Sequence, residues 1–223
     1  MRKLTSTDKA RIEARNKFLS FFPNGFIDEK YIAWERGYKW AAYLLWKKLL
    51  NENQFRSLLS QGKYEELAKL ALHIESKTNL LFSFEKMAIR DALKTSQAAM
   101  QFSKGLYRLV YGKAKPCSRF NEFKEIVADL PRKQTRVLTW PVLTVFAFIA
   151  DPKQFIFLKP KVTKIAAANY HFAFDYSSQP NWNSYQSLLN FSKQISNDLT
   201  DLKPKDHIDI QSFIWTLGSE EYS

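Results

Sequence analysis

Residues 139–168 read TWPVLTVFAFIADPKQFIFLKPKVTKIAAA, and this stretch decides the fold. It contains the most apolar run of the chain, residues 142–150, which holds no charged side chain. Periodicity alone does not distinguish a buried strand from a buried helix in such a run. The start signal Trp140-Pro141 and the helical patterns on both sides favour a helix. We therefore predict a central core helix, which is too short to cross a bilayer because a span needs about 20 apolar residues.

Helical patterns extend outward from this stretch in both directions. A turn at residues 151–153 leads to a second apolar piece, residues 155–158, and Lys159-Pro160 then opens another helix. Amphipathic spacing predicts further helices at residues 4–20, 28–50, 54–60, 64–75, 80–94, 97–110, 120–130, 182–199 and 206–218. No convincing hairpin or internal repeat is present. The predicted class is all-α, with about ten helices.

The helix at residues 28–50 has the clearest pattern in the N-terminal half. Asp28 is its predicted N-cap, and Ile27 and Ile32 flank the cap in the arrangement of a hydrophobic staple. The residues predicted to face the core recur at helical spacing: Trp34, Tyr38, Ala41, Leu45 and Leu49, with Tyr31, Ala42 and Trp46 widening the stripe.

Composition limits the class of protein. Among 223 residues, only six Gly and eight Pro argue against a β-barrel or sandwich, whose turns consume both. The single cysteine, Cys117, cannot form an internal disulfide, and the N-terminus shows no apolar signal sequence, so we expect a cytoplasmic protein. The basic loop at residues 112–118 is the best candidate boundary between two lobes, 1–112 and 119–223, which could also form one continuous domain.

The net charge of +12 favours an anionic partner, either nucleic acid, in the first place DNA, or an acidic protein. Residues 132–164 contain seven basic side chains and one acid, so we predict a basic face for nucleic-acid binding made of Arg132, Lys133, Arg136, Lys153, Lys159, Lys161 and Lys164. Candidates for stacking on an unpaired base are Trp140, Tyr170 and Trp182. The alternative is that the lysines are solvated without a specific use and that these aromatic side chains belong to the core.

No strong catalytic motif and no metal-ligand spacing occurs in the sequence. The histidines, His73, His171 and His207, lie far apart, and we predict neither a metal site nor a cofactor. His207 lies beside Asp206 and Asp209 and could be an acid–base group. The simpler interpretation is structural, because Asp206 fits an N-cap and Asp209 fits the first helical turn.

The order of elements after Leu130 resembles the C-terminal part of helix-hairpin-helix DNA glycosylases of the endonuclease III type. A Leu-Pro and basic turn lead to a buried helix, Leu158-Lys159-Pro160-Lys161 starts the next helix, and the final helix ends in FIWTLGSEEY. Lys159 stands where that family has its catalytic Asp, and PRKQTRVLTWPV lacks the hairpin glycines. The catalytic Lys would fall near Pro141, and no Cys cluster for an iron–sulfur centre follows. The resemblance thus implies a relative that is non-catalytic or has been redirected to another role. The C-terminal block is also similar to uncharacterised bacterial proteins.

Three functions remain open from the sequence. The first is nucleic-acid binding without intrinsic catalysis, through residues 132–164. The second is a helical protein–protein interaction module with an exposed aromatic patch on the Trp34–Trp46 helix. The third is an enzyme with a pocket between the lobes, which would require clustered carboxylates such as Glu35, Glu85 and Asp91. We expect no membrane association.

Overall fold

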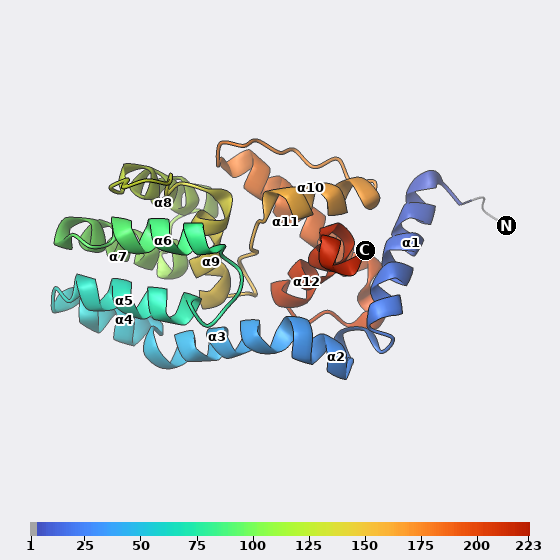
Figure 1. The fold of residues 1–223 in the computed structure, drawn as a ribbon, viewed down its shortest axis with the longest axis horizontal. Helices are drawn as coiled ribbons and strands as arrows, with labels where there is room; N and C mark the ends of the chain where they lie inside the picture. Colours follow the sequence, from blue (N-terminus) through green and yellow to red (C-terminus); the bar gives the residue numbers. More distant parts are fainter. Residues whose placement is uncertain (1–3) are drawn as a thin grey trace.

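The computed structural model describes residues 4–223, and every regular element among them is helical, which confirms the all-α class (Figure 1). Met1 to Lys3, at the start of the predicted N-terminal lobe, lie outside the described residues. The α-helices are α1 (Ser6–Phe21), α2 (Glu29–Tyr31), α3 (Gly37–Leu49), α4 (Glu52–Ser60), α5 (Tyr64–Glu75), α6 (Ser83–Ala92), α7 (Ser96–Tyr111), α8 (Pro116–Asp129), α9 (Trp140–Ala150), α10 (Pro160–Asn169), α11 (Trp182–Asp198) and α12 (His207–Gly218). A π-helical turn, Ile32–Arg36, joins α2 to α3, and short 3₁₀ turns occupy Gly25–Ile27, Thr200–Leu202 and Glu220–Tyr222.

Side-chain caps explain where many helices begin. Thr5, Asn51, Thr95, Asn181 and Asp206 each accept a hydrogen bond from a backbone N–H of the first turn. Such a bond satisfies an amide that has no partner within the helix. The predicted caps at Asp28, Asn181 and Asp206 are confirmed.

Helix α9 lies at the centre of the core. All of its residues are buried, and it packs against α3, α5, α6, α7 and α8. A helix that is apolar all round is stable only when it is covered on every side. The prediction of a buried helix in this run is therefore confirmed. Within the described residues, no helix is long and apolar enough to span a membrane.

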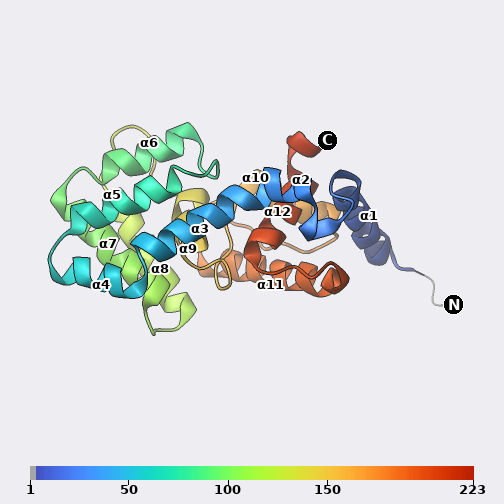
Figure 2. The same cartoon turned by 90° about the horizontal axis from the view of Figure 1, so that it is seen from below.

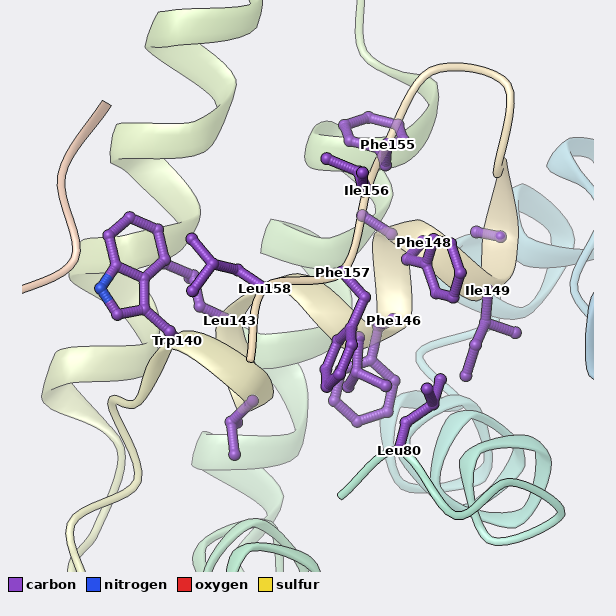
Figure 3. Close-up of a cluster of buried hydrophobic side chains, with 14 of the residues drawn as sticks. Leu80, Trp140, Leu143, Phe146, Phe148, Ile149, Phe155, Ile156, Phe157 and Leu158 are labelled. Atoms are coloured by element: carbon purple, nitrogen blue, oxygen red, sulfur yellow. The ribbon is translucent and has the colours of Figure 1, made fainter. Parts of the chain in front are cut away.

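The apolar piece at residues 155–158 is extended and runs alongside α9 (Figure 3). Phe157 points toward Phe146 and Leu80 in this view. The backbone of the segment is buried, so its polar groups need partners. The Thr144 hydroxyl accepts a hydrogen bond from the amide of Leu158 at 3.1 Å, and the Tyr185 hydroxyl lies 3.1 and 3.2 Å from the N and O of Ile156. Side chains thus take the place of a neighbouring strand.

The helices form two groups, and α3 extends from one group to the other (Figures 1 and 2). One group contains α4–α9, and the other contains α1 and α10–α12. Helices α7 and α8, on either side of the basic loop at residues 112–118, pack against each other, and α1 packs against α12. The groups seen here are therefore not divided at that loop, and one continuous hydrophobic core runs through both.

The buried face of residues 28–50 differs from the predicted one. Trp34 is 56% exposed and Ala41 is exposed, whereas Tyr31, Ala42 and Trp46 are buried as predicted. Ile27 and Ile32 are exposed too, so the predicted staple is wrong. Charged side chains take the inward positions instead: Glu35, Arg36 and Lys39. These charges are tolerated inside because each is paired with a group from a distant part of the chain, as described below.

Candidate functional site

The seven basic residues of the predicted face do not form one surface. Arg136, Lys159 and Lys161 line a common cavity, and the Lys164 ammonium lies 4.9 Å from the ring centre of Tyr176, which lines the same cavity. Lys153 lies elsewhere and lines a separate hollow, together with Lys193 and Lys205. Arg132 and Lys133 are exposed in the loop before α9, where Arg132 Nε donates to the carbonyl of Gln134.

Lys159 is not an exposed contact. The residue is 8% exposed, and its Nζ lies 3.0 Å from Oε2 of Glu85 and 3.3 Å from the carbonyl oxygen of Leu80. The ammonium also lies 3.4 Å from the ring centre of Phe82. Burial lowers the pKa of Lys159 below its ordinary value, against the opposing effect of the Glu85 carboxylate. The prediction that Lys159 lies on the surface is wrong, because its side chain ties α10 to the start of α6.

The cavity around Lys159 has a volume of about 350 Å³, and we call it the aromatic cavity. Phe82 and Phe84 form part of its wall and remain 52% and 46% exposed. The half-buried Tyr176 and Trp215 provide further aromatic surface, and the buried Trp140 also lines the cavity. The ring centres of Phe82 and Phe84 lie 5.6 Å apart, and adjoining exposed apolar side chains often mark an interaction site. The cavity thus combines flat apolar surface with the cations of Arg136 and Lys161.

The three predicted stacking residues belong to the core. Trp140 is buried, and its Nε1 donates to the carbonyl of Ser177 at 2.8 Å. Tyr170 is buried and its hydroxyl donates to Asp198 at 2.7 Å. Trp182 is half-buried and packs on Phe120 and Tyr185.

The exposed aromatic residues at the aromatic cavity are instead Phe82 and Phe84. Phe82 is the residue that precedes α6, and Phe84 belongs to its first turn, so both lie at an end of the helix that the core does not cover. The signal available in the sequence was the pair of rings beside the break at residues 76–79.

Two of the three predicted pocket carboxylates lie in neighbouring cavities. Glu85 lines the aromatic cavity, and Glu35 lines a second cavity of about 340 Å³. Glu35 accepts hydrogen bonds from Lys39 Nζ at 2.8 Å and from the Tyr222 hydroxyl at 2.7 Å. Asp91 lies at the other end of α6 and pairs with Lys94 at 2.7 Å. Neither cavity therefore holds an unpaired carboxylate from this set.

The second cavity is called the amide cavity after Gln211 of α12, which lines it. Trp34, Tyr38 and Lys39 line it too, and Phe82 and Trp215 are shared with the aromatic cavity. Lys39 is 2% exposed, and its Nζ also donates to the hydroxyl of Ser212 at 2.8 Å. Burial lowers the pKa of Lys39, although Glu35 opposes this shift.

The group around His207 is structural. Asp206 caps α12 by accepting a hydrogen bond from the amide of Ile208, and it pairs with Arg36 at 2.8 Å. Asp209 accepts from Arg36 at 2.6 Å and from the Tyr31 hydroxyl at 2.5 Å. His207 Nδ1 lies 3.1 Å from the carbonyl oxygen of Phe155, and burial lowers its pKa. These contacts fix α12 to the turn before α3.

Among residues 4–223, no three His, Cys, Asp or Glu side chains come together in a way that could hold a metal ion. The chain was also compared with known proteins. No protein-family model, curated protein or solved structure matches it. The function therefore has to be inferred from the side chains themselves.

Proposed function

We propose that this protein binds single-stranded nucleic acid at the mouth of the aromatic cavity and carries out no reaction of its own. The observation that supports this most directly is the pair of exposed rings, Phe82 and Phe84, next to the cations of Arg136, Lys161 and Lys164. Bases of a single strand stack on aromatic side chains, and each stacked base contributes about 1–3 kcal/mol. Phosphates bind the neighbouring cations.

The ion pairs at this mouth leave enough positive charge for phosphate. Lys161 pairs with Glu220 at 2.6 Å, but both side chains are mostly exposed and such a pair contributes little. Arg136 and Lys164 form no ion pair with the described residues. The carboxylates that a catalytic function would require, Glu35 and Glu85, are both paired with buried lysines.

Fluorescence anisotropy with labelled single-stranded DNA, single-stranded RNA and duplex DNA tests this function. The site variant R136E/K161E/K164E should weaken single-strand binding at least about tenfold. The control variant K153E/K193E/K205E changes the net charge by the same amount around a separate hollow, so it should bind nearly as wild type does. For three phosphate contacts to a single strand, the slope of log K against log salt should be about −2. An equal loss in both variants, or a preference for duplex, would overturn the proposal.

A second candidate function is protein–protein interaction, and a specific observation favours it. Trp34 and Leu44 are more than half exposed, and Trp40 is 37% exposed on the same helical stretch. A photo-crosslinking residue at position 34, compared in cells with one at exposed position 69 on α5, tests this function. One discrete crosslinked protein that forms only from position 34 would support it, and identical patterns from both positions would exclude it.

A further inference from the structure

Gln211 stands out among the buried polar residues of α12. Asp209 and Ser212 are both paired with side chains of residues 31–39, and the Thr216 hydroxyl donates to the carbonyl of Ser212. Gln211 is 3% exposed, and its Oε1 has no hydrogen-bond partner in the part of the chain that the structure describes. A buried acceptor without a donor costs free energy, so such a group is uncommon unless something else supplies the hydrogen bond.

The position of Gln211 indicates where that donor would come from. The residue lines the amide cavity, whose volume of about 340 Å³ falls at the small end of the range for ligand pockets, roughly 300–1,000 Å³. Trp34, Tyr38, Phe82 and Trp215 provide aromatic walls. Flat rings favour a flat ligand, because planar heterocycles stack on aromatic faces.

The charges around the cavity restrict the ligand further. Its lysine, Lys39, is already paired with Glu35. Glu221 adds another carboxylate to the lining, and its Oε2 accepts a hydrogen bond from Trp215 Nε1 at 3.0 Å. A phosphate or carboxylate group would meet these anions, whereas a neutral ligand with N–H donors would not. The lining therefore favours a planar ligand that carries N–H donors and no negative charge.

We propose that the amide cavity binds one base of a nucleic-acid strand, and that this base carries an exocyclic amino group, as adenine and cytosine do. The Gln211 amide would accept a hydrogen bond from the amino group and donate to the adjacent ring nitrogen, the paired contact that amides make with adenine. The inference rests on the proposed function, because a strand held at the aromatic cavity reaches the amide cavity across the shared residues Phe82 and Trp215.

Anisotropy with single-stranded dA12, dC12 and dT12 tests the assignment. Wild type should bind dA12 and dC12 about tenfold more tightly than dT12. The variant Q211M keeps the length of the side chain and removes both polar atoms, so it should bind all three equally. Thermal unfolding should show Q211M to be as stable as wild type or more so, because the unpaired oxygen is gone. The control Q101M changes an exposed glutamine of α7 and should keep the base preference.

Adenosine and thymidine, followed by quenching of tryptophan fluorescence, separate this inference from the function on which it rests. If no oligonucleotide binds but adenosine quenches wild type and not Q211M, the proposed function and the strand contact fail, and only the assignment of the cavity as a site for a base stands. If oligonucleotides bind without base preference and Q211M matches wild type, the inference is overturned and the function stands. If neither oligonucleotides nor adenosine bind, both are overturned.

Discussion

Replacing Lys159 with Met should destabilise the protein by about 3 kcal/mol, since losing one partner of a buried pair costs about 3–5 kcal/mol. Lys159 Nζ lies 3.0 Å from Glu85 Oε2, and both residues are buried. We expect the lower end of the range because the Glu85 carboxylate keeps its hydrogen bond from the Phe82 amide at 2.8 Å. It also lies in the first turn of α6, where the helix dipole favours an anion.

The double variant E85L/K159M should be within about 1.5 kcal/mol of wild type, because two apolar side chains of similar volume replace a pair whose burial is itself costly. E85L alone leaves the Lys159 ammonium with the Leu80 carbonyl as its remaining hydrogen-bond acceptor. Urea unfolding of the four proteins near neutral pH gives the coupling energy of the pair. If the losses of unfolding free energy in K159M and in E85L added up to the loss in E85L/K159M, the two side chains would not be coupled and this reasoning would be refuted.

The same proteins should differ in their pH dependence. Burial lowers the pKa of Lys159 below its ordinary value of 10.5. Between the lowered pKa and 10.5, the unfolded chain binds more protons at this side chain than the folded chain does, so the stability of the folded state rises with pH. Wild type should therefore gain stability relative to E85L/K159M as the pH rises from neutral toward 10.5. Urea unfolding across this pH range measures this, and a constant or falling difference would contradict the direction of the shift.

The remaining predictions concern packing. A Cβ atom at Gly218 would lie 2.1 Å from the carbonyl oxygen of Val162, so G218A should lower the free energy of unfolding by about 3 kcal/mol through the contact of α12 with α10. The comparison variant G62N should cost less than about 1 kcal/mol, because Gly62 has a positive φ that Asn tolerates and open space around it. If chemical denaturation showed similar losses of stability for G218A and G62N, the packing argument would be refuted. W34A should change stability by less than about 1 kcal/mol and W46A should lower it by about 3–5 kcal/mol, since only Trp46 is buried. Thermal unfolding measures the stability lost in each variant. The sequence pattern places both tryptophans in the core and would therefore predict a large loss for W34A as well.

Helix positions were predictable because their signals are local. The caps at Asp28, Asn181 and Asp206 act within a few residues, and an uncharged run such as residues 142–150 needs burial wherever it lies. The face of α3 was not predictable in the same way. Its inward charge Lys39 pairs with Ser212, which is 173 residues away in sequence, and the π-helical turn at Ile32–Arg36 shifts the helical register. A periodicity rule that places charges outside cannot anticipate such partners.

The candidate site depends even more on distant contacts. The basic face predicted within residues 132–164 included Arg136 and Lys161, which do lie at the aromatic cavity. Spacing along the chain did not separate them from Lys153, which lies beside another hollow. It also did not reveal that Lys159 would be buried in an ion pair with Glu85, or that Phe82 would line two cavities. The burial of Lys159 follows from the packing of this residue against Phe82 and Glu85, which no short stretch encodes.

The burial of α9 on every side has a consequence for synthesis. The helices that surround it from the N-terminal side, α3 and α5–α8, are synthesised before residue 140 has been translated. The apolar faces of these helices then stay uncovered, because α9, against which they pack in the folded protein, has not yet been made. A released chain that ends at residue 139 should therefore stay sensitive to protease and bind chaperones, and a released chain that ends beyond residue 158 should begin to resist digestion.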